Sequence, residues 1–121
     1  MNSRDRQICR KLLSEAEILH ELLEGFSMEQ FLHDERTVRA AGMTLINIGE
    51  LVKNLTEELR QAHREIPWRA IAGMRDVSAH KYQTLRKEDV YTTCREDVPL
   101  FAKQIETLLL NDPTGVEKYD P

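Results

Sequence analysis

The sequence predicts an all-α protein built as an antiparallel four-helix bundle, with room for a short fifth helix. Apolar residues recur every three or four positions along most of the chain, glycine and proline are scarce (5 and 4 of 121 residues), and no stretch alternates in polarity as a strand does. Long helices with short connections pack as antiparallel neighbours. We predict one helical domain over residues 1–110 and a loose C-terminal tail over residues 111–121.

The first predicted helix covers about residues 3–24. Its apolar side chains step by three or four residues and therefore share one face: Ile8, Leu12, Ala16, Leu19, Leu23 and Phe26. Gly25 ends the helix. Ser27 followed three residues later by Gln30 is a capping-box pattern, which predicts that a short helical turn starts there.

Asp34 is a good N-cap for a long helix that we expect to run to about Arg60. Its apolar stripe steps alternately by three and four residues: Val38, Ala41, Leu45, Ile48, Val52, Leu55 and Leu59. Gly42 and Gly49 lie seven residues apart inside this helix, and each costs roughly 1 kcal/mol relative to alanine. We expect another segment of backbone to approach closely on that side.

Pro67 suits the first turn of a third helix, where its missing N–H is not needed. Trp68 follows as a core or interface anchor. We expect this helix to end near residues 80–82.

The last helix should begin around residues 87–89, where two acidic side chains favour a helix N-terminus. Its apolar stripe again steps by three or four residues: Val90, Cys94, Val98, Phe101, Ile105 and Leu108. Pro99 falls inside this helix and should kink it, because proline removes one backbone hydrogen bond to Arg95.

The chain carries a net charge of −4, with an isoelectric point of about 5.6. So acidic a protein should not bind nucleic acid indiscriminately, because attraction to phosphate is the sequence-independent part of that affinity. The charge is uneven, however. Residues 60–87 hold seven basic and two acidic side chains, a net +5, which leaves −9 for the rest of the chain. This basic block is either a solvated helix face or a surface for an anionic partner.

Two cysteines, Cys9 and Cys94, fall on or beside apolar stripes and lack a C-x-x-C partner. This placement is typical of small buried residues in a reduced, cytoplasmic protein. No cysteine or histidine pair has the spacing of zinc ligands, so we expect no metal site. The charged N-terminus lacks the apolar segment of a signal peptide, and the longest apolar run is too short to span a membrane.

The basic block contains the polar stretch GMRDVSAHKY, residues 73–82. Asp76 and His80 are four residues apart, so on a helix the carboxylate can fix the imidazole tautomer and leave the other nitrogen for acid–base work. Arg75 and Tyr82 are seven apart and form a second stripe. One straight helix does not bring both stripes to one site. Either the helix ends near His80, or the site is assembled from two chains.

Chemically, a histidine that titrates near neutrality can take a proton from a ribose 2′-hydroxyl or protonate a leaving oxygen, and an arginine can hold the phosphate. His80 and Arg75 therefore suffice for RNA cleavage without a metal. There is a structural alternative. His80 can cap a helix dipole, Arg75 can pair with a neighbouring acid, and Tyr82 can cover the core edge. Composition and spacing alone favour this alternative.

The order of segments along the chain adds a resemblance. The octapeptide RDVSAHKY (residues 75–82) has the form R-x-x-x-x-H-x-Y; IGELVKNL (48–55) precedes it, and EDVYTTCREDVPLFAKQIETLL (88–109) follows it. Together these segments resemble the HEPN superfamily and, within it, the HepT-like branch, over roughly residues 3–110. HepT-like proteins are the toxin half of a two-gene system whose antitoxin is a minimal nucleotidyltransferase.

The resemblance implies a HEPN-like bundle of four or five helices that forms a homodimer, with both motifs facing a common cleft. It implies a type VII-like toxin: an endoribonuclease, independent of metals and cofactors, with Arg75 and His80 catalytic and Asp76 in support. It also implies that the antitoxin transfers AMP to Tyr82, which places bulk and negative charge where RNA phosphate must enter. Asparagine often follows the arginine in this branch. Asp76 could weaken RNA binding or raise the pKa of His80.

For other candidate residues, the sequence predicts a role less specifically. Glu50 could face the cleft and orient Arg75, or be an exposed charge on a helix flank; the family pattern favours the first. Arg69 and Lys81 are candidate RNA-phosphate contacts and equally plausible solvated charges. A function of a different class also stays open: a non-catalytic dimeric module that presents Tyr82 or a basic groove to a nucleotidyltransferase. The acidic net charge and the motif aspartate favour that alternative somewhat.

Overall fold

The protein is all-α, as predicted. The computed structural model describes residues 1–76 and 86–113, and every regular element in these ranges is a helix. The helices are α1 (Ser3–Leu23), α2 (Met28–Leu32), α3 (Glu35–Lys53), α4 (Glu57–Ala62), α5 (Trp68–Ala72), the 3₁₀ helix η1 (Gly73–Asp76), α6 (Lys87–Thr92), the π-helix η3 (Thr93–Asp97) and α7 (Val98–Leu110).

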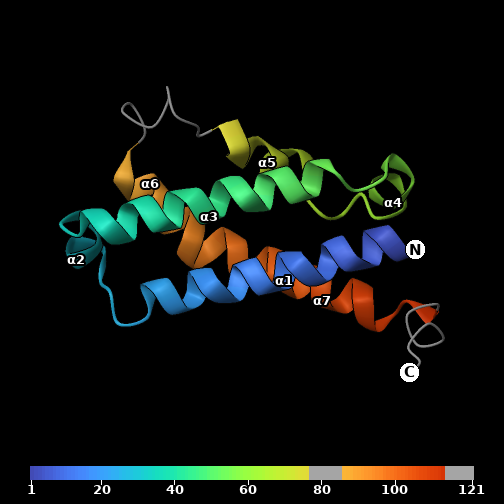
Figure 1. The fold of residues 1–121 in the computed structure, drawn as a ribbon, viewed down its shortest axis with the longest axis horizontal. Coiled ribbons are helices and arrows are strands. Elements are labelled where there is room, and N and C mark those ends of the chain that lie inside the picture. The colour runs from blue at the N-terminus through green and yellow to red at the C-terminus, as the bar shows by residue number, and fades with distance from the viewer. Residues whose placement is uncertain (77–85, 114–121) are drawn as a thin grey trace.

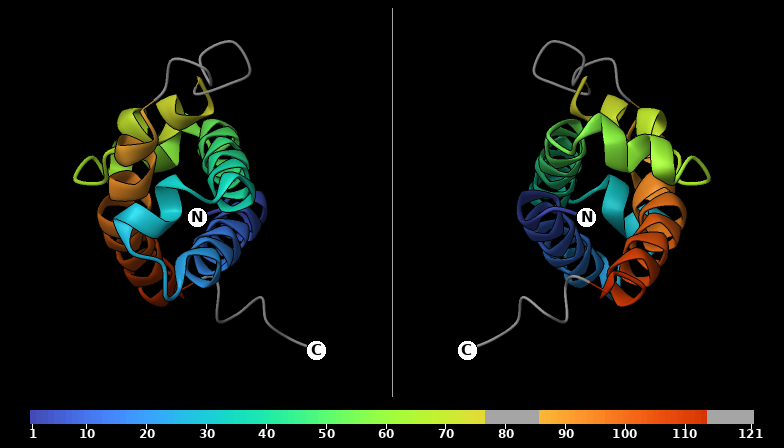
Figure 2. Two further views of the ribbon diagram at one scale, coloured as in Figure 1. Left: turned by 90° about the vertical axis from the view of Figure 1, so that its left-hand side faces the viewer. Right: turned by 90° about the vertical axis from the view of Figure 1, so that its right-hand side faces the viewer.

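Three long rods make the body of the molecule: α1, α3 and the continuous run α6–η3–α7 (Figure 1). Seen end-on, α1 and α3 lie on one side and α7 on the other, while α5 and η1 close the top (Figure 2). The apolar stripes predicted from the sequence point inward and form a single core. Trp68 anchors α5 to this core, because its ring packs edge-on against Phe101 and its indole N–H donates to the carbonyl of His63 at 2.9 Å.

Local signals set the first three helices where the sequence predicts them. Gly25 follows α1 with φ 81°, a left-handed conformation that favours glycine. The capping box before α2 is present, since the Ser27 side chain and the Gln30 side chain each accept from the other residue's backbone N–H. Asp34 caps α3 by accepting from the Thr37 N–H at 3.1 Å. These predictions are confirmed.

The prediction that the second long helix runs to Arg60 is wrong. α3 ends at Lys53, and α4 begins at Glu57 after the N-cap Thr56. The cause is a tertiary contact: the backbone N–H and the hydroxyl of Thr56 both donate to the buried carboxylate of Asp5 on α1, at 3.1 and 2.6 Å. A continuous helix would have needed that N–H for its own ladder.

The third helix also differs from its prediction. Its α-helical part ends at Ala72, and Gly73 begins a 3₁₀ turn that reaches Asp76. Glycine is a poor α-helix former, so a change of helix type is favoured at this position. The predicted end near residues 80–82 lies outside the described residues.

The last helix begins at Lys87, as predicted, and Pro99 does disturb it. The disturbance takes the form of a π-helix over the turn just before the proline, after which Pro99 lies in the first turn of α7. Proline has no N–H to donate to the carbonyl four residues earlier, and its ring crowds that carbonyl, so the ladder opens there.

Asp112, which the prediction places in the loose tail, is buried. Its carboxylate lies 3.4 Å from Nε of Arg6 and 3.7 Å from the N-terminal amine. Residues 114–121 lie outside the described part. Among the described helices, none combines the length and the apolar character needed to cross a membrane.

Candidate functional site

The motif begins on a short 3₁₀ turn. Arg75 and Asp76 are the last two residues of η1, and the chain returns to the described part at Arg86. His80 and Tyr82 lie in the segment between them, outside the described residues, as does Lys81. The roles predicted for these residues stay predictions. The described backbone does show that the α-helix α5 stops before the motif starts and that the first two motif residues lie in a 3₁₀ turn.

α3 is the platform that holds η1. Both η1 and α5 pack against α3. Gly42 and Gly49 are buried on α3. They follow Glu35 at intervals of seven residues and so lie on the same side of the helix as Glu35. Glu35 pairs with Lys87 of α6 at 3.4 Å. The glycines therefore lie on the flank of α3 that faces the elements on either side of the motif. This arrangement fits the predicted close approach of another segment.

A groove of about 660 Å³ runs beside η1. It is lined by the start of α5 and η1, the middle of α3, and the α6–η3–α7 rod, and it includes Met74, Leu45 and Leu100. Most of its lining is apolar, with carboxylates such as Asp89 and Asp97 at the α6–η3 side. None of the described residues that line this groove is cationic, so its described part offers no positive charge to a phosphate.

Basic side chains stand where the chain returns from the motif. Arg86 is exposed and Lys87 is partly exposed, and Glu35 on α3 pairs with Lys87 at 3.4 Å and with Arg39 at 2.9 Å. The hydrogen bond from Lys87, with help from Arg39, lowers the pKa of Glu35 below its ordinary value. Sequence reasoning counted Arg86 and Lys87 in the basic block without assigning them a role. Their position directly after the motif is the feature of the sequence that could have indicated a role beside it.

Arg69 and Glu50 are exposed on different elements. Arg69 lies on α5, one turn before η1, so its side chain is accessible beside the start of the motif. Glu50 lies on α3 and lines a shallow hollow of about 300 Å³ with residues of α1, including Lys11 and Glu15. The described surroundings of Glu50 thus place it at the α1–α3 seam, and its predicted role in orienting Arg75 stays a prediction.

A hollow of about 960 Å³ lies at the opposite end of the bundle from the α6 end of the motif, among α1, α4 and the end of α7. Its buried acids already have partners: Asp5 accepts from Thr56, and Asp112 pairs with Arg6. Sequence reasoning missed this polar cluster because its members are far apart in the chain. Among the described residues, no group of three or more histidine, cysteine, aspartate or glutamate side chains could hold a metal ion.

Comparison with known proteins gives a consistent result. The family model described as "Ribonuclease HepT-like" matches residues 12–108. The protein named "Putative RNase TTE0752", from Caldanaerobacter subterraneus subsp. tengcongensis, is 38% identical over 104 residues, which cover 86% of this chain and 93% of the relative. The "Probable ribonuclease HepT" of Thermococcus cleftensis is 35% identical over 92 residues, covering 76% of this chain and 84% of that protein.

No solved structure gives a significant match to this chain. The family match spans most of the helical domain, from the middle of α1 to the end of α7, and it includes the whole motif segment. This chain therefore belongs to the HepT-like ribonuclease family of the HEPN superfamily.

Proposed function

We propose that this chain is the toxin of a type VII-like toxin–antitoxin system and that it acts as a metal-independent endoribonuclease. The observation that carries the proposal is the family match over residues 12–108, which contains the R-x-x-x-x-H-x-Y motif in full. The names of the relatives, an RNase and a ribonuclease, point to the same class of reaction. The exposed cations on both sides of the motif support an anionic substrate.

The proposed reaction needs two side chains. His80 takes the proton from a ribose 2′-hydroxyl, and the resulting oxygen attacks the adjacent phosphorus. The bond from phosphorus to the 5′-oxygen breaks, and that oxygen leaves with the proton that the protonated His80 gives up. The products are a 2′,3′-cyclic phosphate and a 5′-hydroxyl. Arg75 holds the phosphate through two parallel hydrogen bonds and stabilises the charge that develops on it.

The neighbouring residues take supporting roles. Asp76 fixes the tautomer of His80, and Glu50 orients Arg75. Arg69 on α5 and Lys81 in the motif segment contact phosphates of the bound RNA, and these contacts make affinity depend on salt concentration.

Regulation acts on Tyr82. Its phenol oxygen attacks the α-phosphorus of ATP bound to the partner nucleotidyltransferase, pyrophosphate leaves, and the phenol proton is released. The product, AMP joined to the tyrosine oxygen, carries a negative charge beside the phosphate site and blocks RNA entry by bulk and by repulsion. Homodimerisation would place two motifs around one cleft.

The test is RNA cleavage by the purified chain in the presence of a chelator. His80→Ala should lower the rate by about 10²- to 10⁴-fold, as expected for loss of an acid–base catalyst. The matched control is His33→Ala, because His33 is exposed at the end of α2 and should leave the rate unchanged. Equal cleavage by wild type and His80→Ala would contradict the proposal.

A wild-type chain that does not cleave RNA, yet gains the mass of AMP on Tyr82 when incubated with the partner and ATP, would favour the alternative of a non-catalytic module. The net acidic charge and Asp76 are the observations behind that alternative.

A further inference from the structure

The groove beside η1 lies between two helical walls, and we call it the η1 groove. One wall is a stripe of the α6–η3–α7 rod whose members step by three or four positions: Asp89, Thr93, Asp97, Leu100 and Gln104. The other wall is formed by α5 and η1. At the rise of a helix, the stripe spans about 20 Å, the length of nearly four helical turns. The η1 groove is therefore long enough to hold one more helix.

Apolar surface stays open in this groove. Leu100 on one wall is 63% exposed, an unusual position for a large apolar side chain, and Met74 on the other wall is half-buried. Ala70 and Gly73 are small and exposed on the same wall as Met74. A Cβ atom built on Gly73 would meet no neighbouring atom within 4 Å. A further helix can therefore bring its backbone close to this wall and cover both apolar side chains.

The charged and unsatisfied groups of the groove are all hydrogen-bond acceptors. Among the described lining residues, three carry a charge, and each is an exposed carboxylate: Glu65, Asp89 and Asp97. Within the described part of the chain, Asp89 and Asp97 have no ion-pair partner. Gln104, at the far end of the stripe, has a buried Oε1 atom that accepts no hydrogen bond from the residues described. An occupant that supplies cationic donors would satisfy these acceptors.

We propose that the η1 groove is a docking surface for a helix of another protein, one whose apolar stripe is flanked by lysine or arginine. Docking of an amphipathic helix into an apolar groove is a recurring mode of protein recognition. The apolar stripe covers Leu100 and Met74, and the flanking cations pair with Asp89 and Asp97. RNA is a poor occupant, because the three carboxylates repel its phosphates.

The docked helix lies beside the motif. Met74 lines the groove and directly precedes Arg75 in the chain. Asp89 lies three residues after Arg86, where the chain returns from the motif segment. The occupant therefore contacts the elements on both sides of that segment. Docking goes beyond the proposed function and does not require it, because no step of RNA cleavage contributes to the contact.

The test begins with a phage library of helical peptides of about 16 residues, selected for binding to the full wild-type chain. The library keeps an apolar stripe on every peptide and allows either lysine or glutamate at each flanking position. We expect lysine to be enriched at the flanking positions of the peptides that bind. Enrichment of glutamate, or a selection that yields no binder, would overturn the proposal.

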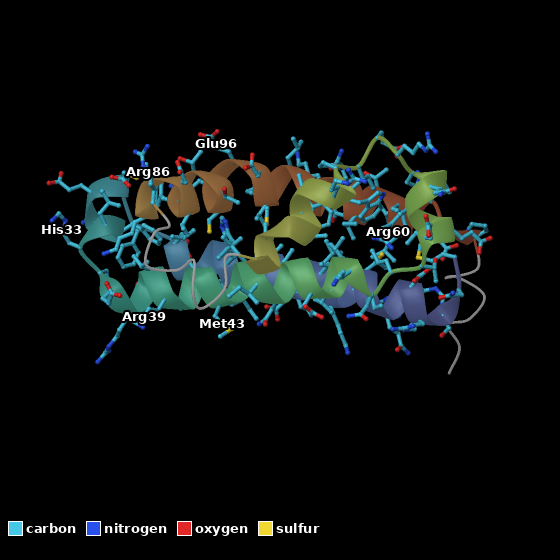
Figure 3. The ribbon with its side chains drawn as sticks, turned by 90° about the horizontal axis from the view of Figure 1, so that it is seen from above. His33, Arg39, Met43, Arg60, Arg86 and Glu96 are labelled. Atoms are coloured by element: carbon cyan, nitrogen blue, oxygen red, sulfur yellow. The ribbon has the colours of Figure 1, made fainter. Side chains whose placement is uncertain are left out.

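Charge variants then locate the strongest peptide, with fluorescence anisotropy as the readout and circular dichroism to verify folding. Asp97→Lys should weaken binding about tenfold, because an attractive charge pair becomes a repulsive one. The matched control is Glu96→Lys, which makes the same change in net charge and should bind nearly as wild type does. Glu96 lies outside the groove and projects from the side of the rod that is turned away from α5 and η1 (Figure 3). Equal losses in the two variants would mean that only net charge matters, which contradicts docking in the groove.

A second pair of variants tests the apolar contact. Leu100→Ser should weaken binding by about tenfold or more, because it removes most of the apolar area that the peptide covers at this position. Leu110→Ser is the matched control and should bind as wild type does. Leu110 is 79% exposed at the end of α7 and lies outside the groove. Unchanged binding by Leu100→Ser would overturn the proposal.

Two other occupants are tested with the same variants. If a second copy of this chain fills the groove, wild type self-associates in sedimentation equilibrium and Leu100→Ser does not. If RNA fills it, single-stranded RNA displaces the peptide, and Asp97→Lys binds that RNA more tightly than Glu96→Lys does. Either result would rule out a helix of another protein as the occupant.

These outcomes are independent of RNA cleavage. A chain that passes the binding tests but does not cut RNA overturns the proposed function and leaves the docking surface standing. A chain that cuts RNA but selects no basic helix leaves the function standing and overturns the docking surface.

Discussion

Loss of the Thr56 hydroxyl should be among the most damaging single changes outside the apolar core. This hydroxyl accepts from the Leu59 N–H at 3.2 Å as the N-cap of α4, and it donates to the buried Asp5 carboxylate at 2.6 Å. Thr56→Val keeps the shape and removes both bonds. The lost cap costs about 1 kcal/mol. The lost bond to a charged acceptor costs about 1.5–3 kcal/mol. We expect a total near 3 kcal/mol.

The assay is urea unfolding followed by circular dichroism at one fixed chain concentration, because any self-association would make the measured stability depend on concentration. A loss of this size corresponds to a fall in Tm of roughly 10 °C for a chain of this length. Thr56→Ser is the matched control, since it keeps the hydroxyl, and it should lose no more than about 1 kcal/mol. A Thr56→Val variant as stable as wild type, or a Thr56→Ser variant as unstable as Thr56→Val, would refute the reasoning.

Three further predictions concern groups with known surroundings. Burial raises the pKa of the Cys9 and Cys94 thiols to about 12. Native protein at pH 8 should therefore react with iodoacetamide about a thousandfold more slowly than unfolded protein. Mass spectrometry would measure the two alkylation rates, and equal rates would contradict the prediction. The pKa of Glu35 is lowered in the folded state, so the stability it contributes is present above its unfolded value of about 4.5 and is lost as pH falls through the folded value. Glu35→Gln should therefore have a lower Tm than wild type at pH 7 and the same Tm near pH 3. A difference in Tm between the two proteins that grows as the pH falls would count against a stabilising pair with Lys87. Trp68→Phe loses the indole hydrogen bond and should destabilise the protein by about 1–3 kcal/mol in urea unfolding; a neutral effect would mean that the bond contributes nothing.

The features that sequence predicted well depend on neighbouring residues. Ser27 and Gln30 form their capping box within four residues. Asp34 caps α3 by accepting a hydrogen bond from a residue only three positions later. Pro99 disturbs its helix because the missing N–H belongs to the proline itself. In each case, the deciding interaction lies inside the window that a reader of the sequence examines.

The errors have a different origin. The break between α3 and α4 depends on Asp5, which lies 51 residues before Thr56, and the apolar stripe continues through the break because Leu55 and Leu59 remain buried. Periodicity therefore gave no sign of it. A local hint was available, since Thr56 precedes two glutamates, a good N-terminal sequence for a helix.

For the candidate site, sequence identified the motif, and the structure places its first two residues on η1 against α3.

The central claim is that this chain cuts RNA by attack of the 2′-hydroxyl, with Arg75 and His80 and without a metal. The most direct measurement is the chemistry of the cut ends, read by mass spectrometry after incubation of wild type with single-stranded RNA in excess chelator. We expect a 2′,3′-cyclic phosphate on one fragment and a 5′-hydroxyl on the other, and no cleavage where the nucleotide at the cut is replaced by its 2′-deoxy form. Fragments that end in a 3′-hydroxyl and a 5′-phosphate, or cleavage of the 2′-deoxy substrate, would contradict the account.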